Sequence, residues 1–321
     1  MKGVANVVIP TFTQDLLDVS EAATRFDIRH EIELGFWGTL LVSETATTLD
    51  EYERFTRWAV DESKGRLRMI HHSSFNTLEE AIQAGRAAQA AGVDLVLLSY
   101  PPTFYPTSQR DIINYTEAYC NSVDLGVILF PVPLWGFERL HPAGIAPEAI
   151  AELVRDVPNL VAIKAEGGMP TIGGFVECYR RFHDQVIVTH PLEADALLLK
   201  QLVDIPFMGT SNYEYFGPLV PRVFRLIDEG KLDEAMDLYW TMHPARLVNQ
   251  AMASVPGANF LHRMLWKYQG WLNGFNGGPL RAPTMRLNGN QMKALRKGLV
   301  DCGFDVTPDD DSRFFVGRNP E

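Results

Sequence analysis

The sequence is poor in cysteine and contains no long apolar run. Its three cysteines, Cys120, Cys178 and Cys302, are far apart and odd in number, which fits neither a disulfide framework nor a metal site with paired ligands. We therefore expect reduced thiols with a packing role, and a cytoplasmic protein. No stretch approaches the roughly 20 apolar residues that span a bilayer, and residues 1–4 lead into an apolar run rather than a secretion signal.

Basic residues are also scarce. The 29 lysines and arginines are outnumbered by 40 aspartates and glutamates, which leaves a net charge of −11 and a pI near 5.2. Nucleic acid and anionic membranes repel such a chain, so neither is an expected partner. The first apolar run is followed by Pro-Thr-Phe-Thr at residues 10–13 and not by Gly-x-Gly-x-x-Gly, which argues against a dinucleotide-binding sheet.

What the sequence does contain is a regular alternation of apolar runs and helical patterns up to about residue 230. The runs are nearly continuous Val, Ile, Leu and Met, as in strands that are buried on both faces of a parallel sheet. The expected strands are residues 4–10, 37–42, 67–71, 95–99, 127–130, 160–164, 186–189 and 205–209.

Helical spacing separates these strands. Ser20 is a candidate N-cap, Thr77 begins a capping-box pattern with Glu80, and Gly92 is a favourable helix end. The expected helices are residues 20–34, 49–62, 81–91, 109–122, 147–154, 173–182, 193–202 and 219–228.

Eight strand–helix units in series predict an α/β fold, a (β/α)8 TIM barrel with a C-terminal helical appendix. We assign residues 1–229 to the barrel and residues 230–321 to a helical region packed on it. Helices are expected there at residues 231–249, 257–273 and 290–300. Residues 308–312 are expected to form an acidic, solvated segment.

Lys164 is a candidate nucleophile at the active face of this barrel. Active sites of such barrels lie at the C-terminal ends of the strands, and Lys164 closes the apolar run 160–163. Desolvation there favours the neutral amine, which attacks carbonyl carbon. A lysine that is paired with a carboxylate such as Glu166 is the structural alternative.

Four segments carry a family pattern. They are Val8-Ile9-Pro10-Thr11-Phe12, Phe130-Pro131-Val132-Pro133, residues 159–164 followed by Gly167-Gly168, and Gly277-Gly278-Pro279-Leu280-Arg281-Ala282-Pro283. In order and spacing, residues 3–303 resemble the dihydrodipicolinate synthase/N-acetylneuraminate lyase family of class I aldolases. The resemblance implies that Lys164 forms a Schiff base with pyruvate or a related 2-oxo acid and that no metal or organic cofactor is required. It also implies a homo-oligomer, either a tetramer or a dimer.

The chain departs from the family pattern at two places. Relatives carry a proton-relaying tyrosine where this chain has Phe130, which lacks a hydroxyl. Their carboxylate-binding loop Gly-Thr-Thr-Gly-Glu aligns with Leu-Val-Ser-Glu-Thr at residues 41–45, so both glycines are missing. Ser43 is the first candidate to contact the carboxylate, and Thr45 or Thr47 is the second.

Several side chains could replace the missing phenol. Glu44 is a candidate base, unless it points away from the site, and an unpaired Glu44 would repel a substrate carboxylate. His71 or His72 could shuttle protons because the pKa of histidine is near 7, with loop packing as the alternative. Tyr105 resembles a loop tyrosine that belongs to the proton relay of relatives and often enters a neighbouring subunit.

The loops at this end are rich in aromatic residues. These rings are Phe36, Trp37, Tyr100, Phe104, Tyr105, Trp135 and Phe137. Packing layers are one use for them, and a wide apolar pocket for an aromatic or hydrophobic substrate is the other. Phe130 and Trp135 are assigned to substrate binding. The resemblance adds Gly209, which would leave room for the 2-oxo acid, and Thr210, while Arg139 is a further candidate carboxylate anchor.

The sequence therefore predicts a Schiff-base lyase that acts on a 2-oxo acid, with a hydratase-aldolase for an aryl-substituted pyruvate as its more specific form. A Schiff-base dehydratase, decarboxylase or deaminase is an alternative, because a substrate with its own acid or base would not need the tyrosine. A barrel that has lost efficient catalysis and binds a ligand is the alternative of another class.

Overall fold

The computed structural model describes residues 1–166, 171–254 and 258–321. Its eight strands form one sheet in the order β7-β6-β5-β4-β3-β2-β1-β8, and β7 contacts β8. The strands are β1 Gly3–Val8, β2 Gly38–Leu41, β3 Arg68–His72, β4 Leu95–Leu97, β5 Gly126–Leu129, β6 Leu160–Lys164, β7 Ile187–Thr189 and β8 Phe207–Met208. The predicted (β/α)8 barrel is thus confirmed.

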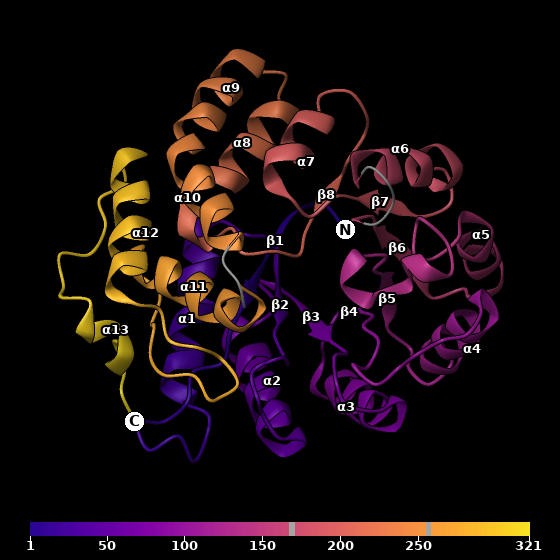
Figure 1. Ribbon diagram of the computed structural model, residues 1–321, viewed down its shortest axis with the longest axis horizontal. Helices are drawn as coiled ribbons and strands as arrows, with labels where there is room; N and C mark the ends of the chain where they lie inside the picture. Colours follow the sequence, from indigo (N-terminus) through magenta and orange to yellow (C-terminus); the bar gives the residue numbers. More distant parts are fainter. Residues whose placement is uncertain (167–170, 255–257) are drawn as a thin grey trace. The chain divides into compact units, whose positions relative to one another are not determined.

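Helices follow the strands in alternation (Figure 1). The barrel helices are α1 Glu21–Leu34, α2 Leu49–Ser63, α3 Leu78–Ala91, α4 Gln109–Cys120, α5 Pro147–Asp156, α6 Thr171–Phe182, α7 Glu193–Leu199 and α8 Leu219–Asp228. The later helices are α9 Leu232–Thr241, α10 His243–Ala253, α11 Ala258–Leu272, α12 Gly289–Asp301 and α13 Ser312–Val316. Short 3-10 helices are η1 Pro133–Trp135, η2 Phe137–Arg139 and η3 Glu214–Phe216.

The helix ends that the sequence marked are confirmed. The Ser20 side chain accepts a hydrogen bond from the amide of Ala23, and Thr77 accepts one from the amide of Glu80. Gly92 ends α3 in the left-handed conformation with φ of 94°. Local sequence therefore determined where these helices begin and end.

The first of two compact units comprises Met1–Ala5 and Arg68–Ser211. Its strands β3 to β7 pair in parallel, and α3 to α6 lie side by side along them (Figure 1). A continuous apolar core fills the layer between strands and helices. Because the strands bury both faces, the reactive side chains of this unit must lie at strand ends or within the barrel interior.

The second unit comprises Asn6–Leu67 and Asn212–Glu321. The Gly-Gly-Pro segment has a packing reason here, because both glycines have positive φ. A Cβ at Gly277 would lie 2.7 Å from the Trp271 ring, and one at Gly278 would lie 2.6 Å from Thr11. No other residue type fits these two positions without rearrangement.

Three expectations about the C-terminal region have different outcomes. Residues 231–249 form two helices and not one, because α10 begins at His243 and has Pro244 in its first turn, where proline starts a helix but cannot continue one. Residues 308–310 are exposed as expected, whereas Asp311 accepts hydrogen bonds from Tyr268 and Arg296. The boundary between residues 229 and 230 stays a prediction. None of the described helices is long and apolar enough to cross a bilayer.

Candidate active site

Lys164 lies at the C-terminal end of β6 and is 5% exposed. Its Nζ donates a hydrogen bond of 2.7 Å to the main-chain oxygen of Thr210. The same atom lies 3.8 Å from the centroid of the Phe130 ring. A ring face and a carbonyl oxygen both attract N–H groups, so these two contacts orient the side chain of the candidate nucleophile.

Alternation along β6 directs Lys164 away from the helices. Its neighbours Ile163 and Ala165 belong to the core between strands and helices. Successive side chains of a strand point to opposite faces, so Lys164 points into the barrel interior. Gly167 and Gly168, which follow it in the family pattern, lie outside the described residues.

Strand register separates the two histidines of β3. His71 pairs with Val96, which belongs to the helix-facing core, and the His71 ring stacks on Phe75 with 6.1 Å between centroids. Burial lowers the pKa of His71 to about 3, so this ring is neutral near pH 7. His72 is the next residue in the strand and points to the opposite face, the one that carries Lys164. Of the two, His72 is therefore the residue whose side chain shares a face with Lys164.

Phe130 follows β5 and is the aromatic neighbour of Lys164. The ring of Trp135 packs edge-on against it, with 5.9 Å between centroids. The indole Nε1 of Trp135 also donates a hydrogen bond of 2.7 Å to the Phe130 carbonyl oxygen. These two rings form an apolar surface beside the lysine.

The other rings of this unit largely contact one another. Tyr100 is buried, with ring centroids of Phe104, Tyr115 and Phe137 between 5.1 and 5.6 Å away. Its hydroxyl is 2.8 Å from Thr116 Oγ1. These side chains therefore form a packing layer, and Trp135 joins it through an edge contact with Tyr100, with 5.7 Å between ring centroids. The aromatic substrate pocket stays a prediction.

Tyr105 points outward and is 74% exposed. The guanidinium of Arg139 lies 3.7 Å from the centroid of its ring and donates a hydrogen bond to the Pro106 carbonyl oxygen. Within the described chain the Tyr105 hydroxyl is thus open to solvent, and Arg139 supports the tyrosine-bearing loop.

Gly209 and Thr210 follow β8. A Cβ at Gly209 would lie 2.8 Å from the Ala5 carbonyl oxygen of β1, so close strand packing is one reason for this glycine. Thr210 is buried, and its Oγ1 has no hydrogen-bond partner among the described residues. A hydroxyl in that state is available to a ligand.

The loop after β2 carries the candidate carboxylate-binding residues. Ser43 and Thr45 are buried, and the Thr45 amide donates a hydrogen bond of 2.9 Å to the Ser43 carbonyl oxygen. Glu44 forms an ion pair with Arg263 of α11. The positive charge of Arg263 offsets the negative charge of Glu44, which would otherwise repel an anionic substrate.

Arg263 is the residue that sequence reasoning missed. It lies 219 positions from Glu44, so no local spacing could have joined them. The local sequence offered one sign that Arg263 is held in place, because Trp266 follows it by three residues in the same helix. The centroid of the Trp266 ring lies 4.6 Å from the guanidinium.

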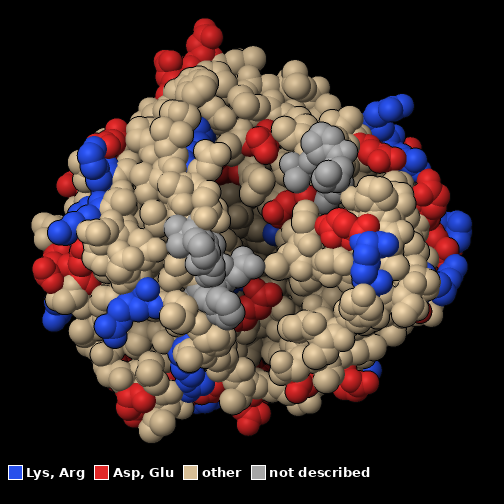
Figure 2. Space-filling model, viewed as in Figure 1, with Lys and Arg blue, Asp and Glu red and all other residues tan. Residues whose placement is uncertain are grey.

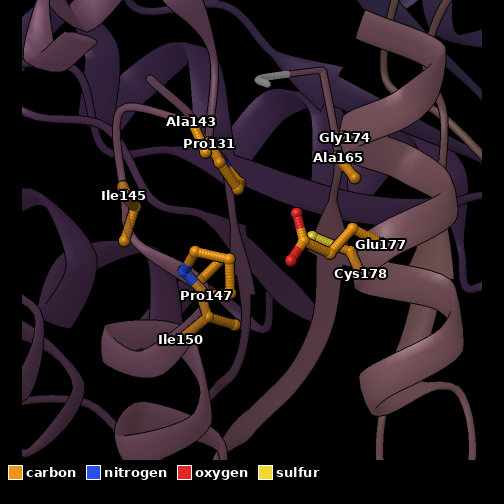
Figure 3. A pocket seen from close by; sticks show the side chains of 9 residues that line it. All are labelled: Pro131, Ala143, Ile145, Pro147, Ile150, Ala165, Gly174, Glu177 and Cys178. Carbon is orange, nitrogen blue, oxygen red and sulfur yellow. The ribbon is translucent and has the colours of Figure 1, made fainter. Parts of the chain in front are cut away.

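A small cavity lies on the helix-facing side of β5 and β6. In Figure 3 the Glu177 carboxylate and Pro147 face each other across it, and Pro131 and Ala165 belong to its lining. Its volume of about 10 Å³ leaves room for about one water molecule. This cavity is therefore too small to hold a substrate.

Charged side chains of both signs are interspersed on the molecular face in Figure 2. In the described ranges, no three His, Cys, Asp or Glu side chains are grouped to hold a metal ion.

The fold and Lys164 define the class: a parallel (β/α)8 barrel with a buried lysine at the end of its sixth strand. The model of the dihydrodipicolinate synthetase family matches residues 1–299, and the chain belongs to that family. Members of this family are class I aldolase-type lyases.

Individual relatives agree with this assignment. A 4-hydroxy-tetrahydrodipicolinate synthase of Lachnoclostridium phytofermentans is 35% identical over 281 residues, which cover 83% of this chain and 84% of that protein. Two synthases of that name, from Methanopyrus kandleri and Salinibacter ruber, are matched over 59% and 54% of their own lengths.

Solved structures show the same fold. An N-acetylneuraminate lyase from Fusobacterium nucleatum has a TM-score of 0.77 at 18% identity, with 93% of this chain and 97% of that chain covered. A family protein from E. coli K12, solved in complex with pyruvate, has a TM-score of 0.78 at 18% identity, with 94% and 99% covered.

Proposed function

We propose that this protein is a Schiff-base-forming lyase of the class I aldolase type that acts on a 2-oxo acid of the pyruvate type. The observation that supports this most directly is the buried amine of Lys164, which is oriented by Thr210 and Phe130 inside the barrel. Membership of the family and the pyruvate complex of the E. coli relative point to the same chemistry.

In the first step the neutral Lys164 amine attacks the ketone carbon. A carbon–nitrogen bond forms, the carbonyl oxygen takes up two protons and leaves as water, and a protonated imine remains. The bond between the carbon next to the imine and the hydroxyl-bearing carbon then breaks, and its electron pair forms the double bond of an enamine. The hydroxyl group on the departing carbon loses its proton, so this fragment leaves as an aldehyde. Protonation of the enamine and hydrolysis return the lysine.

Proton transfer and carboxylate binding are assigned to the remaining candidates. We propose His72 as proton shuttle, because register directs it into the barrel interior. Tyr105 would contribute from a neighbouring subunit, since its ring is exposed on its own. Glu44 has a more limited part as a base because it is paired with Arg263, and Ser43 and Thr45 of its loop would bind the carboxylate.

An aromatic or hydrophobic substituent on the substrate is the finer proposal, as in a hydratase-aldolase. It is supported by the rings of Phe130 and Trp135 beside Lys164. The missing phenol at Phe130 favours the alternatives of a Schiff-base dehydratase, decarboxylase or deaminase. Product analysis separates them, because aldolysis releases pyruvate and an aldehyde, while the others release water, carbon dioxide or ammonia.

The proposal includes a cytoplasmic homo-oligomer, a dimer or tetramer. The three cysteines are all buried free thiols, which suits a reducing compartment. The exposed ring of Tyr105 suits a residue that is covered by a second copy of the chain.

The test is borohydride reduction of the protein in the presence of pyruvate and a panel of aryl 2-oxo acids, followed by intact mass and peptide mapping. We expect one adduct on Lys164 and none in Lys164→Arg. Lys200→Arg is the matched control, because Lys200 is another buried lysine of the same unit that donates to a main-chain carbonyl, that of Ile205. Folded protein that binds a 2-oxo acid without any adduct would instead identify the ligand-binding alternative.

A further inference from the structure

The ring of His190 is fully buried between two hydrogen-bond acceptors. His190 directly follows β7, and Asp195 lies in the first turn of α7. The ring atom Nδ1 lies 3.1 Å from the Ala165 carbonyl oxygen, and Nε2 lies 3.4 Å from Oδ2 of Asp195. A carbonyl oxygen and a carboxylate only accept hydrogen bonds, so both ring nitrogens must carry a proton for the two bonds to form together. The carboxylate then also balances the positive charge of the doubly protonated ring.

The first of these acceptors belongs to the residue that directly follows Lys164. The amide of Ala165 donates to the Thr189 carbonyl oxygen at 2.8 Å, and its carbonyl oxygen faces the His190 ring. The two peptide groups that flank Ala165 are thus held from the side of β7, one by main chain and the other by a side chain. Of these two bonds, substitution of His190 removes only the second and leaves the strand pairing intact.

His190 and Lys164 lie on opposite faces of the sheet. Lys164 pairs with Thr189, so these two side chains share the face toward the barrel interior. His190 is the next residue and points the other way, toward α6, where its ring centroid lies 5.9 Å from that of Phe175. All of these residues belong to the first compact unit. The ring therefore acts on the reaction only through the main chain of Ala165.

We propose that His190 is a positioning residue for the nucleophile Lys164. Its Nδ1–H holds the Ala165 carbonyl group, and Asp195 holds the ring in the direction that makes this bond. The inference rests on the proposed function, because it takes Lys164 as the nucleophile. Misplacement of a reacting group by about 1 Å can cost about 10²-fold in rate. Loss of the bond should therefore slow imine formation and leave substrate affinity nearly unchanged.

The experiment uses two amides that each imitate one ring nitrogen. The side-chain nitrogen of asparagine corresponds to Nδ1 and that of glutamine to Nε2, so His190→Asn keeps the donor to Ala165 and His190→Gln keeps the donor to Asp195. Borohydride quenching at successive times after mixing with pyruvate gives the rate of imine formation on Lys164. At saturating pyruvate we expect a rate roughly 10- to 100-fold below wild type in His190→Gln, and within about three-fold of wild type in His190→Asn. The half-saturating concentration should stay within about two-fold in both.

His183 provides the matched control. It is another histidine of the same unit, and its Nδ1 lies 2.7 Å from the Tyr179 carbonyl oxygen at the exposed end of α6. His183→Gln and His183→Asn should leave the rate of imine formation unchanged. Equal rates in His190→Asn and His190→Gln would overturn the proposal, because a role in packing alone does not distinguish the two amides.

A variant of Asp195 keeps the proposal testable if His190→Gln does not fold. The Asp195 side chain is 33% exposed, so Asp195→Ala changes the packing little while it removes the group that directs the His190 ring. We expect imine formation to slow by roughly 3- to 10-fold in this variant. A rate equal to that of wild type would overturn the proposal.

Hydrogen exchange separates this inference from the Schiff-base chemistry. Without any substrate, the amides of residues 160–166 should exchange at least about 10-fold faster in His190→Gln than in His190→Asn, since a strand end that has lost a bond opens more readily. Faster exchange would show that His190 holds the end of β6 even if wild type forms no adduct, which would reject the proposed function alone. An adduct in wild type with equal exchange and equal rates in both variants would reject His190 and leave the proposed function standing.

Discussion

The Nζ atom of Lys164 lies 3.8 Å from the centroid of the Phe130 ring. An aromatic face thus meets the candidate nucleophile at the position to which the family resemblance assigns a tyrosine. The ring favours a nearby cation through its quadrupole but cannot give or take a proton. Phe130 can therefore help to orient the lysine, whereas any proton transfer needs another group.

Phe130→Tyr should restore a hydroxyl beside Lys164. We expect kcat to rise by roughly 10- to 100-fold with a 2-oxo acid whose cleavage needs proton transfer, since general acid–base help contributes about 10²–10⁴-fold. Steady-state kinetics measure this, with Phe130→Leu as the control that removes the ring and adds no hydroxyl. An unchanged kcat in Phe130→Tyr would mean that another group already transfers the proton.

His72→Gln should lower kcat by about 10²-fold or more and change the pH profile of kcat/KM, while imine trapping on Lys164 persists. The matched control is His71→Gln on the same strand, whose ring lies on the helix-facing side beside Phe75. We expect that variant to keep its kcat within about two-fold while changing stability. Equal losses of kcat in both variants would contradict a specific role for His72.

Tyr105 can be assigned to its own or a neighbouring subunit by mixing two inactive variants. Tyr105→Phe and Lys164→Ala chains are unfolded together and refolded so that hybrids form. If Tyr105 acts in the site of the partner subunit, each hybrid dimer contains one complete site, in which the intact lysine of one chain meets the intact tyrosine of the other. Random pairing of a dimer should then recover roughly a quarter of wild-type activity. No recovery from hybrids whose assembly is shown by native mass spectrometry would place Tyr105 in its own subunit or outside the reaction.

The buried carboxyl group of Glu214 should make the free energy of unfolding depend on pH. Burial raises the pKa of its carboxyl to about 8, against an ordinary value of 4.5. The folded protein therefore holds a proton that the unfolded chain releases, and the stability that Glu214 contributes below about pH 4.5 is lost as the pH rises through 8. Glu214→Gln cannot ionise, so we expect it to be more stable than wild type at pH 9 by on the order of 1–3 kcal/mol, with no such gain at pH 5.

Urea unfolding at pH 5 and pH 9 measures this difference. Glu229→Gln is the control, because Glu229 lies exposed beside Lys231 and should change neither value. A pH dependence in Glu214→Gln equal to that of wild type would show that other groups, such as the buried Asp27, cause it.

Much of the fold could be predicted because its signals are local. Apolar runs marked the strands, and Ser20, Thr77 and Gly92 marked helix ends. The single helix expected over residues 231–249 failed because helical spacing continued through Pro244, and the proline was compatible with the start of a second helix. The local pattern of residues thus located the helices and strands, but it missed the break between α9 and α10.

The candidate site was predictable only in part. Lys164 was found because it ends an apolar strand and lies in a family segment. The choice between His71 and His72 depended on which residue of β4 each one pairs with, and a shift of one residue would have exchanged their faces. Arg263 could not be found at all, because its pairing with Glu44 joins residues 219 positions apart.

By itself, the sequence determined the barrel class, the family and the candidate nucleophile, since these follow from strand and helix periodicity and from motif order. Only the tertiary structure decided that Phe130 faces the lysine, that the Tyr100 rings form a packing layer and that Glu44 is paired. The reason is physical: side-chain direction and ion pairing depend on strand register and on contacts between distant segments, which no local pattern of residues specifies.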